Sequence, residues 1–184
     1  MASDPHYQPI TVEQFLAMDF GTDRKFELAN GVIQMMTGGT ETHAWVTNNI
    51  TAWLRPKLRG SGCRSYGSEM GVRVTDYDVR YPDVSIYCGP RPEHGANIKA
   101  LSEPVIVIEV LSPTTATYDQ GTKLDEYRTL PSVKLIAFID PVNELVSVHS
   151  RTEGGWHVLT PKVRDLDLAL VGLSIPHTEI FARD

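Results

Sequence analysis

The chain has 184 residues, of which 41% are hydrophobic and 22% charged, and its formal net charge is -6 at pH 7. This composition is typical of one compact domain with a substantial core, so we treat residues 1–184 as a single domain. The acidic balance argues against a protein that binds nucleic acid over its whole surface, but it leaves room for a local basic groove. No signal peptide or membrane span is indicated, and we expect a cytoplasmic protein with no membrane partner.

The two cysteines, Cys63 and Cys88, lie far apart in the sequence and lack the paired spacing of a zinc site. We therefore expect both to be free thiols in a reducing compartment.

The first part of the chain predicts a helix, a hairpin and a second helix. Thr11-Val12-Glu13-Gln14 matches a capping box that begins a short helix. Asn30-Gly31 lies between two alternating runs and predicts a tight hairpin over residues 25–36, since both central positions of such a turn favour positive φ. Apolar residues at helical spacing predict a helix over residues 40–58.

The remaining segments alternate between strands, loops and one long helix. In chain order we predict strands within 63–74, a strand opened by Pro82, a loop over 89–103, a strand over 105–111, a helix over 118–130, strands over 134–140, 145–150 and 156–159, and a short helical end at 177–181.

A carboxylate lies in the middle of the most hydrophobic strand, residues 105–111. Alternate side chains of a strand share a face, so Glu109 points with Val107 and Leu111. An ionised glutamate buried there needs a cation, a metal ion or hydrogen-bond donors to replace its hydration. Pairing with an arginine is the purely structural alternative.

A second acid, Asp83, follows Pro82 at the start of a strand. If this strand neighbours the one that carries Glu109, the two carboxylates can meet at one rim of the sheet. Two hard oxygen ligands suit Mg²⁺ or Mn²⁺, with water in the other positions. Asp83 could also be an ordinary turn residue.

Four short motifs occur in a characteristic order. They are Phe26-Glu27-Leu28-Ala29-Asn30-Gly31, Pro82-Asp83-Val84, the run from Val107 to Pro113, and Asp119-x3-Lys123-x3-Tyr127, with Phe138-Ile139-Asp140-Pro141 near the end. Together they resemble the Uma-type family of restriction endonucleases, part of the PD-(D/E)XK nuclease superfamily, over nearly the whole chain.

The resemblance implies a restriction-endonuclease-like α/β (α+β) core with a mixed central sheet flanked by helices. It implies that Asp83 and Glu109 bind a metal ion, that Glu27 extends the metal site, and that all three are catalytic together with Lys123. The superfamily usually has a lysine two residues after the second acid, but this chain has Leu111 there. Lys123 matches the position to which that lysine can migrate.

Structural alternatives remain for three of the polar residues. Asp119 and Lys123 have the spacing of an ordinary surface ion pair on a helix. His43 is a lone histidine on a helix, which is more often a packing or surface residue. Tyr127 could order the amine of Lys123, but we expect it to fill the core.

These features predict a Mg²⁺-dependent endonuclease, with Mn²⁺ as a substitute ion, that hydrolyses DNA phosphodiester bonds. One alternative is a nuclease-fold binding or regulatory module that no longer cuts, which the acidic charge and Leu111 favour. Another is a metal-dependent hydrolase of RNA or nucleotides. By analogy with restriction enzymes we expect a homodimer, with an interface near residues 145–159.

Overall fold

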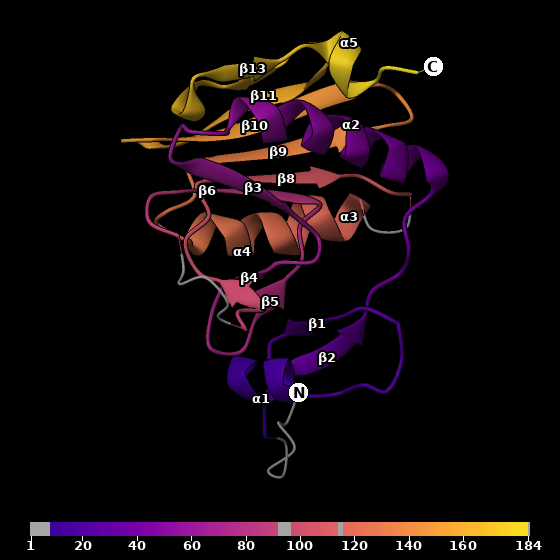
Figure 1. Ribbon diagram of the computed structural model, residues 1–184, viewed down its shortest axis with the longest axis vertical. Coiled ribbons are helices and arrows are strands. Elements are labelled where there is room, and N and C mark those ends of the chain that lie inside the picture. The colour runs from indigo at the N-terminus through magenta and orange to yellow at the C-terminus, as the bar shows by residue number, and fades with distance from the viewer. Residues whose placement is uncertain (1–7, 92–96, 114–115, 184) are drawn as a thin grey trace.

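A six-stranded mixed sheet lies at the centre of the computed structural model, which describes residues 8–91, 97–113 and 116–183 (Figure 1). The strand order is β11-β10-β9-β8-β6-β3. Neighbours are antiparallel except for β8 and β9, which run parallel. The strands are β3 (Cys63–Gly67), β6 (Val84–Cys88), β8 (Ile106–Val110), β9 (Leu135–Asp140), β10 (Leu145–Thr152) and β11 (Gly155–Lys162).

A second, five-stranded sheet has the order β2-β1-β5-β4-β7. Its strands are β1 (Phe26–Ala29), β2 (Val32–Met35), β4 (Gly71–Arg73), β5 (Val79–Arg80) and β7 (Ala100–Leu101). The β1–β2 turn has φ of 50° at Asn30 and 73° at Gly31, which confirms the predicted hairpin. A small two-stranded sheet, β12 (Leu166–Leu168) and β13 (Leu173–Ile175), follows near the C-terminus. Of the loop predicted over 89–103, residues 92–96 lie outside the described residues.

Helices cover both faces of the large sheet (Figure 1). On one face α2 (Glu41–Lys57) and α5 (His177–Ile180) pack over a core that includes Ile106, Ile108 and Val110. On the other face α4 (Leu124–Thr129) packs over a core that includes Val107. The alternation predicted for the 105–111 strand therefore separates two cores, and the expected mixed sheet flanked by helices is confirmed.

The N-terminal part of the chain forms a third, smaller core. Helix α1 (Val12–Ala17) begins at the predicted capping box, in which Gln14 N–H donates to Thr11 Oγ1 and Thr11 N–H donates to Gln14 Oε1. Val12 and Phe15 of this helix pack against the second sheet. In the part of the chain that the structure describes, no helix has the length and apolarity needed to cross a membrane.

The segment predicted as one helix over 118–130 contains a change of helix type. Helix α3 (Ala116–Tyr118) leads into a π-helical turn, η1 (Asp119–Lys123), which α4 follows without a break. Leu124 N–H donates to the carbonyl of Asp119, five residues back, as a π-turn requires. Such turns insert one extra residue into a helix and are frequent at functional sites.

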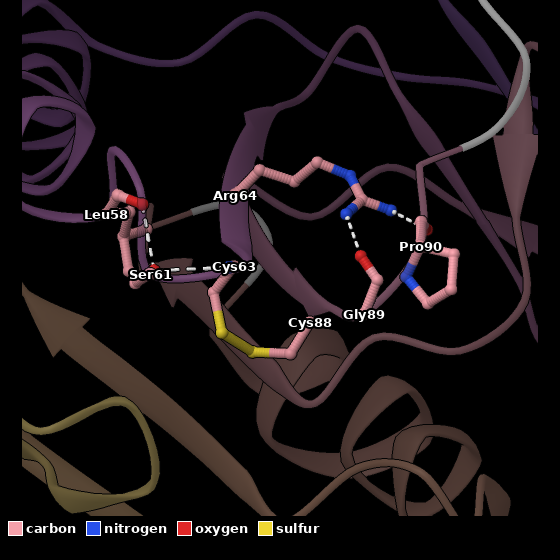
Figure 2. Close-up of a disulfide and its surroundings, with 7 residues drawn as sticks. All are labelled: Leu58, Ser61, Cys63, Arg64, Cys88, Gly89 and Pro90. Atoms are coloured by element: carbon pink, nitrogen blue, oxygen red, sulfur yellow. Dashed lines mark hydrogen bonds between the residues drawn. A yellow bond between two sulfur atoms is a disulfide. The ribbon is translucent and has the colours of Figure 1, made fainter.

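The two cysteines form a disulfide in the structure, so the expectation of free thiols is wrong (Figure 2). β3 and β6 are antiparallel, and their register places Cys63 opposite Cys88. Arg64, next to Cys63, donates to the carbonyls of Gly89 and Pro90 at 2.9 Å each and holds the chain just beyond the disulfide. The pairing depends on strand register, which the spacing of two cysteines in a sequence does not reveal.

Candidate active site

Asp83 and Glu109 come together at one rim of the large sheet. In the antiparallel pair β6–β8, Val84 lies opposite Ile108, so the next position along each strand brings Asp83 to Glu109. The N–H of Val110 donates to Asp83 Oδ2 at 2.8 Å and fixes Asp83 beside the end of β8. The two predicted acids thus meet because their strands are neighbours.

The Glu109 carboxylate is buried, with 3% of the residue exposed. Tyr127 Oη donates to Glu109 Oε1 at 2.8 Å, and Lys123 Nζ lies 3.6 Å from the same oxygen. Burial, with Asp83 and Asp119 nearby, raises the pKa of Glu109 to about 8, although Lys123 opposes this shift. The cation beside Glu109 is thus Lys123 and not the arginine that the structural alternative required. Tyr127, which we expected to fill the core, is buried and also donates a hydrogen bond to the carboxylate.

Lys123 belongs to the buried site as well as to an ion pair on its own helix. Its Nζ lies 3.0 Å from Asp119 Oδ1, the predicted i,i+4 pair, but both residues are buried rather than on the surface. Burial lowers the pKa of Lys123, but the carboxylates of Glu109 and Asp119 outweigh it, so the pKa stands above its usual value. Lys123 is therefore a buried cation between two carboxylates.

His43, which the sequence favoured as a packing residue, contacts Asp83 directly. Its Nε2 lies 3.1 Å from Asp83 Oδ2, and this hydrogen bond raises the pKa of His43. A Cβ at Gly39 would come within 2.5 Å of His43 Nδ1, so glycine leaves room for the ring. The sequence held no signal for this contact, because α2 and β6 are brought together only by the fold.

Glu27 lies on β1 and is held by Arg80, a residue that sequence reasoning did not single out. Glu27 is 5% exposed; its Oε1 lies 3.3 Å from Arg80, and its Oε2 has no hydrogen bond within the described residues. Burial raises the pKa of Glu27, against the opposing charges of Lys123 and Arg80. Arg80 is fully buried and donates through Nε and Nη2 to both oxygens of Glu126 at 2.6 Å.

A cavity of about 680 Å³, here called the main cavity, lies beside Asp83 and Glu109. Asp83, Glu109, Asp119 and Lys123 line one part of it, and Arg24 and Lys25 line another. Glu27 does not line the main cavity, although its charge interacts with that of Lys123. The structure thus brings Asp83, Glu109 and Lys123 to one cavity and leaves Glu27 outside its lining.

Asp83 and Glu109 carry the oxygen ligands that suit a divalent ion. Over residues 8–91, 97–113 and 116–183, no group of three or more His, Cys, Asp or Glu side chains is arranged to hold a metal ion. Within the same residues, the hydrogen bonds and ion pairs of Asp83 involve Oδ2, and those of Glu109 involve Oε1. The second carboxylate oxygen of each residue is therefore open to an ion. Mg²⁺ commonly takes one or two carboxylates and fills its other positions with water and phosphate oxygens.

The mixed sheets flanked by helices form a nuclease-like α+β fold. A putative nuclease of the DUF820 family from Anabaena variabilis has the same fold, with a TM-score of 0.76 and 19% identity, covering 95% of this chain and 98% of that one. The model of the Uma2 family, described as "Putative restriction endonuclease", matches residues 12–178. The chain belongs to this family.

Two proteins of Synechocystis sp. strain PCC 6803, both described as uncharacterized, are similar in sequence. Protein slr1290 is 27% identical over 171 residues, covering 91% of this chain and 89% of the relative. Protein sll1609 is 26% identical over 133 residues, covering 71% and 75%. The likeness to slr1290 therefore extends over nearly the whole of both chains.

Proposed function

We propose that this protein is a Mg²⁺-dependent endonuclease that hydrolyses phosphodiester bonds of DNA, with Mn²⁺ as a substitute ion. The observation that carries the proposal is the meeting of Asp83 and Glu109 on neighbouring strands, beside Lys123 and at the wall of the main cavity. Membership of a family described as restriction endonucleases supports the same reaction class.

Asp83 and Glu109 are the proposed ligands of the ion, and Glu27 remains a predicted contributor to its binding. When bound there, the ion would act as a Lewis acid, which would make a water easier to deprotonate and offset negative charge on the phosphate. The Val110 N–H and His43 orient the Asp83 carboxylate, and Tyr127 orients that of Glu109. The ligands are thus held in place by hydrogen bonds from three different elements.

Lys123 is the proposed catalytic cation. Its ammonium group, held by Asp119 at 3.0 Å and facing the main cavity, can orient the attacking water and stabilise negative charge on the phosphoryl oxygens. A lysine on the helix can serve in this way although Leu111 occupies the usual position on the strand. What counts is the position of the ammonium group near the phosphate, and not the strand or helix that carries the lysine.

The test is cleavage of plasmid and linear DNA with Mg²⁺ or Mn²⁺ by the wild type and by Asp83→Asn, Glu109→Gln and Lys123→Met. We expect cleavage by the wild type and a loss of at least 100-fold in each variant, which is typical for removal of a catalytic electrostatic group. The matched control is Asp125→Asn, which removes a carboxylate whose side chain is 80% exposed on α4. It should cut at the wild-type rate.

Other outcomes would assign a different function. Cleavage of RNA or nucleotides alone would overturn DNA as the substrate, and parallel assays with these substrates test this. No cleavage, together with no Mn²⁺ binding in titration calorimetry, would favour a non-cutting binding module. We also propose a homodimer, because two copies can reach both strands of a duplex; sedimentation velocity at micromolar concentration would show its mass or that of a monomer.

A further inference from the structure

A second cavity adjoins the main cavity and differs from it in chemistry. It has a volume of about 260 Å³ and shares Arg24, Lys25, Ser68 and Tyr81 with the lining of the main cavity. The rest of its lining is largely apolar and includes three phenylalanines, so we call it the aromatic cavity. Apart from Glu69 and Lys99, a ligand that passes the shared border meets apolar and aromatic side chains there, whereas the main cavity holds the carboxylates of Asp83 and Glu109.

The rings of the aromatic cavity are already arranged as a stack. The ring centroids of Phe20 and Phe26 lie 4.3 Å apart with an interplanar angle of 21°, and Phe15 lies 5.7 Å from Phe20. Phe20 and Phe26 are only partly buried. The cavity has room for about nine waters at ~30 Å³ each.

The two cations on the shared border have weak partners. The guanidinium of Arg24 donates to Met35 Sδ at 3.4 Å, its one side-chain hydrogen bond among the described residues, and a thioether is a weak acceptor. Lys25 donates to Ser68 Oγ at 3.2 Å and pairs with Glu69, but the side chains of Lys25 and Glu69 are 44% and 87% exposed. An ion pair so open to solvent contributes little, so both cations can turn to a phosphate at small cost.

We propose that the aromatic cavity receives an unpaired base of a DNA strand whose neighbouring phosphate is bound by Arg24 and Lys25. The inference rests on the proposed nuclease function and specifies its substrate as single-stranded DNA, or a single-stranded segment of a larger DNA. Sequence-tolerant binding of single strands combines aromatic stacking with a cationic path for the backbone, and both occur here. A base within an intact duplex would first have to leave its pair and its stack, which an unpaired base does not.

The charge of the protein agrees with this choice. A protein that makes about six to ten contacts with the phosphates of duplex DNA loses affinity steeply as salt rises. The shared border offers two cations, on a chain of net charge -6. For a single strand, two contacts predict a slope of about -1.4 in a plot of log affinity against log salt. Stacking of one base then supplies the part of the affinity that does not depend on salt.

The test measures binding of fluorescein-labelled oligothymidylate by anisotropy, with Ca²⁺ in place of Mg²⁺ to limit hydrolysis. Arg24→Ala should flatten the salt slope by about 0.7, whereas Arg55→Ala, which removes an exposed cation at the far end of α2, should leave it unchanged. Phe20→Leu keeps an apolar side chain but removes the ring, and should weaken binding about tenfold. An oligonucleotide with one abasic position, scanned along the strand, should lose affinity for the wild type but not for Phe20→Leu.

Cleavage rates on single-stranded and blunt duplex DNA test this inference separately from the proposed function. Faster cleavage of single strands or overhangs than of blunt duplex supports the inference. Cleavage that depends on Asp83 and Glu109 but is as fast on blunt duplex overturns the inference and leaves the nuclease function intact. Equal salt slopes for Arg24→Ala and Arg55→Ala, or no effect of any abasic position on the wild type, would also overturn it.

Discussion

The phenol of Tyr127 donates to Glu109 Oε1 at 2.8 Å in a fully enclosed part of the site. Tyr127→Phe removes this donor and leaves a buried acceptor short of a partner. We expect a loss of about 1–3 kcal/mol in the free energy of unfolding and a ~10- to 100-fold loss in Mn²⁺ affinity. Urea unfolding and titration calorimetry measure the two effects.

The control for Tyr127→Phe is Tyr87→Phe. Tyr87 is also a buried tyrosine, but its hydroxyl donates to a backbone carbonyl, that of Leu101 at 3.4 Å, and not to Glu109. Its removal should affect stability alone. A Mn²⁺ affinity that is unchanged in Tyr127→Phe would show that the hydroxyl does not orient the ligand.

Arg80 and Glu126 form a two-point ion pair between β5 and α4. Arg80→Met leaves Glu126 and Glu27 without this fully buried cation, and we expect the free energy of unfolding to fall by about 3–5 kcal/mol. The double variant with Glu126→Gln should cost less than the sum of the single changes. A double-mutant cycle in urea measures the coupling.

Arg73→Met is the matched control, since Arg73 pairs with Glu13 at the surface, where the side chains are 31% and 64% exposed. A surface pair of this kind contributes about 0–1 kcal/mol. If Arg80→Met cost no more than Arg73→Met, the buried network would not stabilise the fold.

The stability of the metal-free protein should depend on pH through Glu109. The pKa of Glu109 is about 8 in the folded protein, against an ordinary value of 4.5, so the folded state retains a proton that the unfolded state releases. Stability should therefore be greatest below about pH 5 as far as this group is concerned, and its contribution should be lost as pH rises to about 8. Melting temperatures in EDTA across this range measure it.

Glu109→Gln removes the titrating group and should flatten this part of the pH profile. Above about pH 8 the variant should melt at or above the wild-type temperature, because it buries no carboxylate charge. A wild-type profile as flat as that of Glu109→Gln would contradict the raised pKa.

The Cys63–Cys88 disulfide closes a loop between positions separated by 25 in the sequence. Its reduction should lower the free energy of unfolding by about 2–4 kcal/mol, because the unfolded chain gains freedom. Urea unfolding with and without reductant measures the effect. For the double variant Cys63→Ser/Cys88→Ser, reductant should not change the free energy of unfolding. If reductant also left that of the wild type unchanged, the bond would not form in solution.

Local patterns predicted the elements well. The Asn30-Gly31 turn, the Thr11 capping box and the alternation of residues 105–111 depend on neighbours in sequence, and each is found in the structure. The meeting of Asp83 with Glu109 followed once their strands were taken as neighbours. Backbone geometry that depends on a few adjacent residues can thus be read from the chain.

Contacts between distant elements could not be predicted in this way. His43 reaches Asp83 from another layer, and Cys63 meets Cys88 through strand register. Arg80 stood in the sequence beside the Pro82-Asp83 motif, but its partner Glu126 lies on a helix far along the chain. These pairs form because packing of the sheets and helices brings them together, and no spacing rule encodes them.

The extra residue of the η1 turn separates two tasks along one helix. An added residue rotates the later half of the helix by about 100° relative to the earlier half, so the two halves need not obey one hydrophobic stripe. Leu124 and Tyr127 can face the core, while Asp119, before the extra residue, faces the main cavity. In a homologue shorter by one residue here, one helical stripe would have to serve both core packing and the orientation of the charged groups. In this chain the packing of the later half can change without changing the orientation of Asp119.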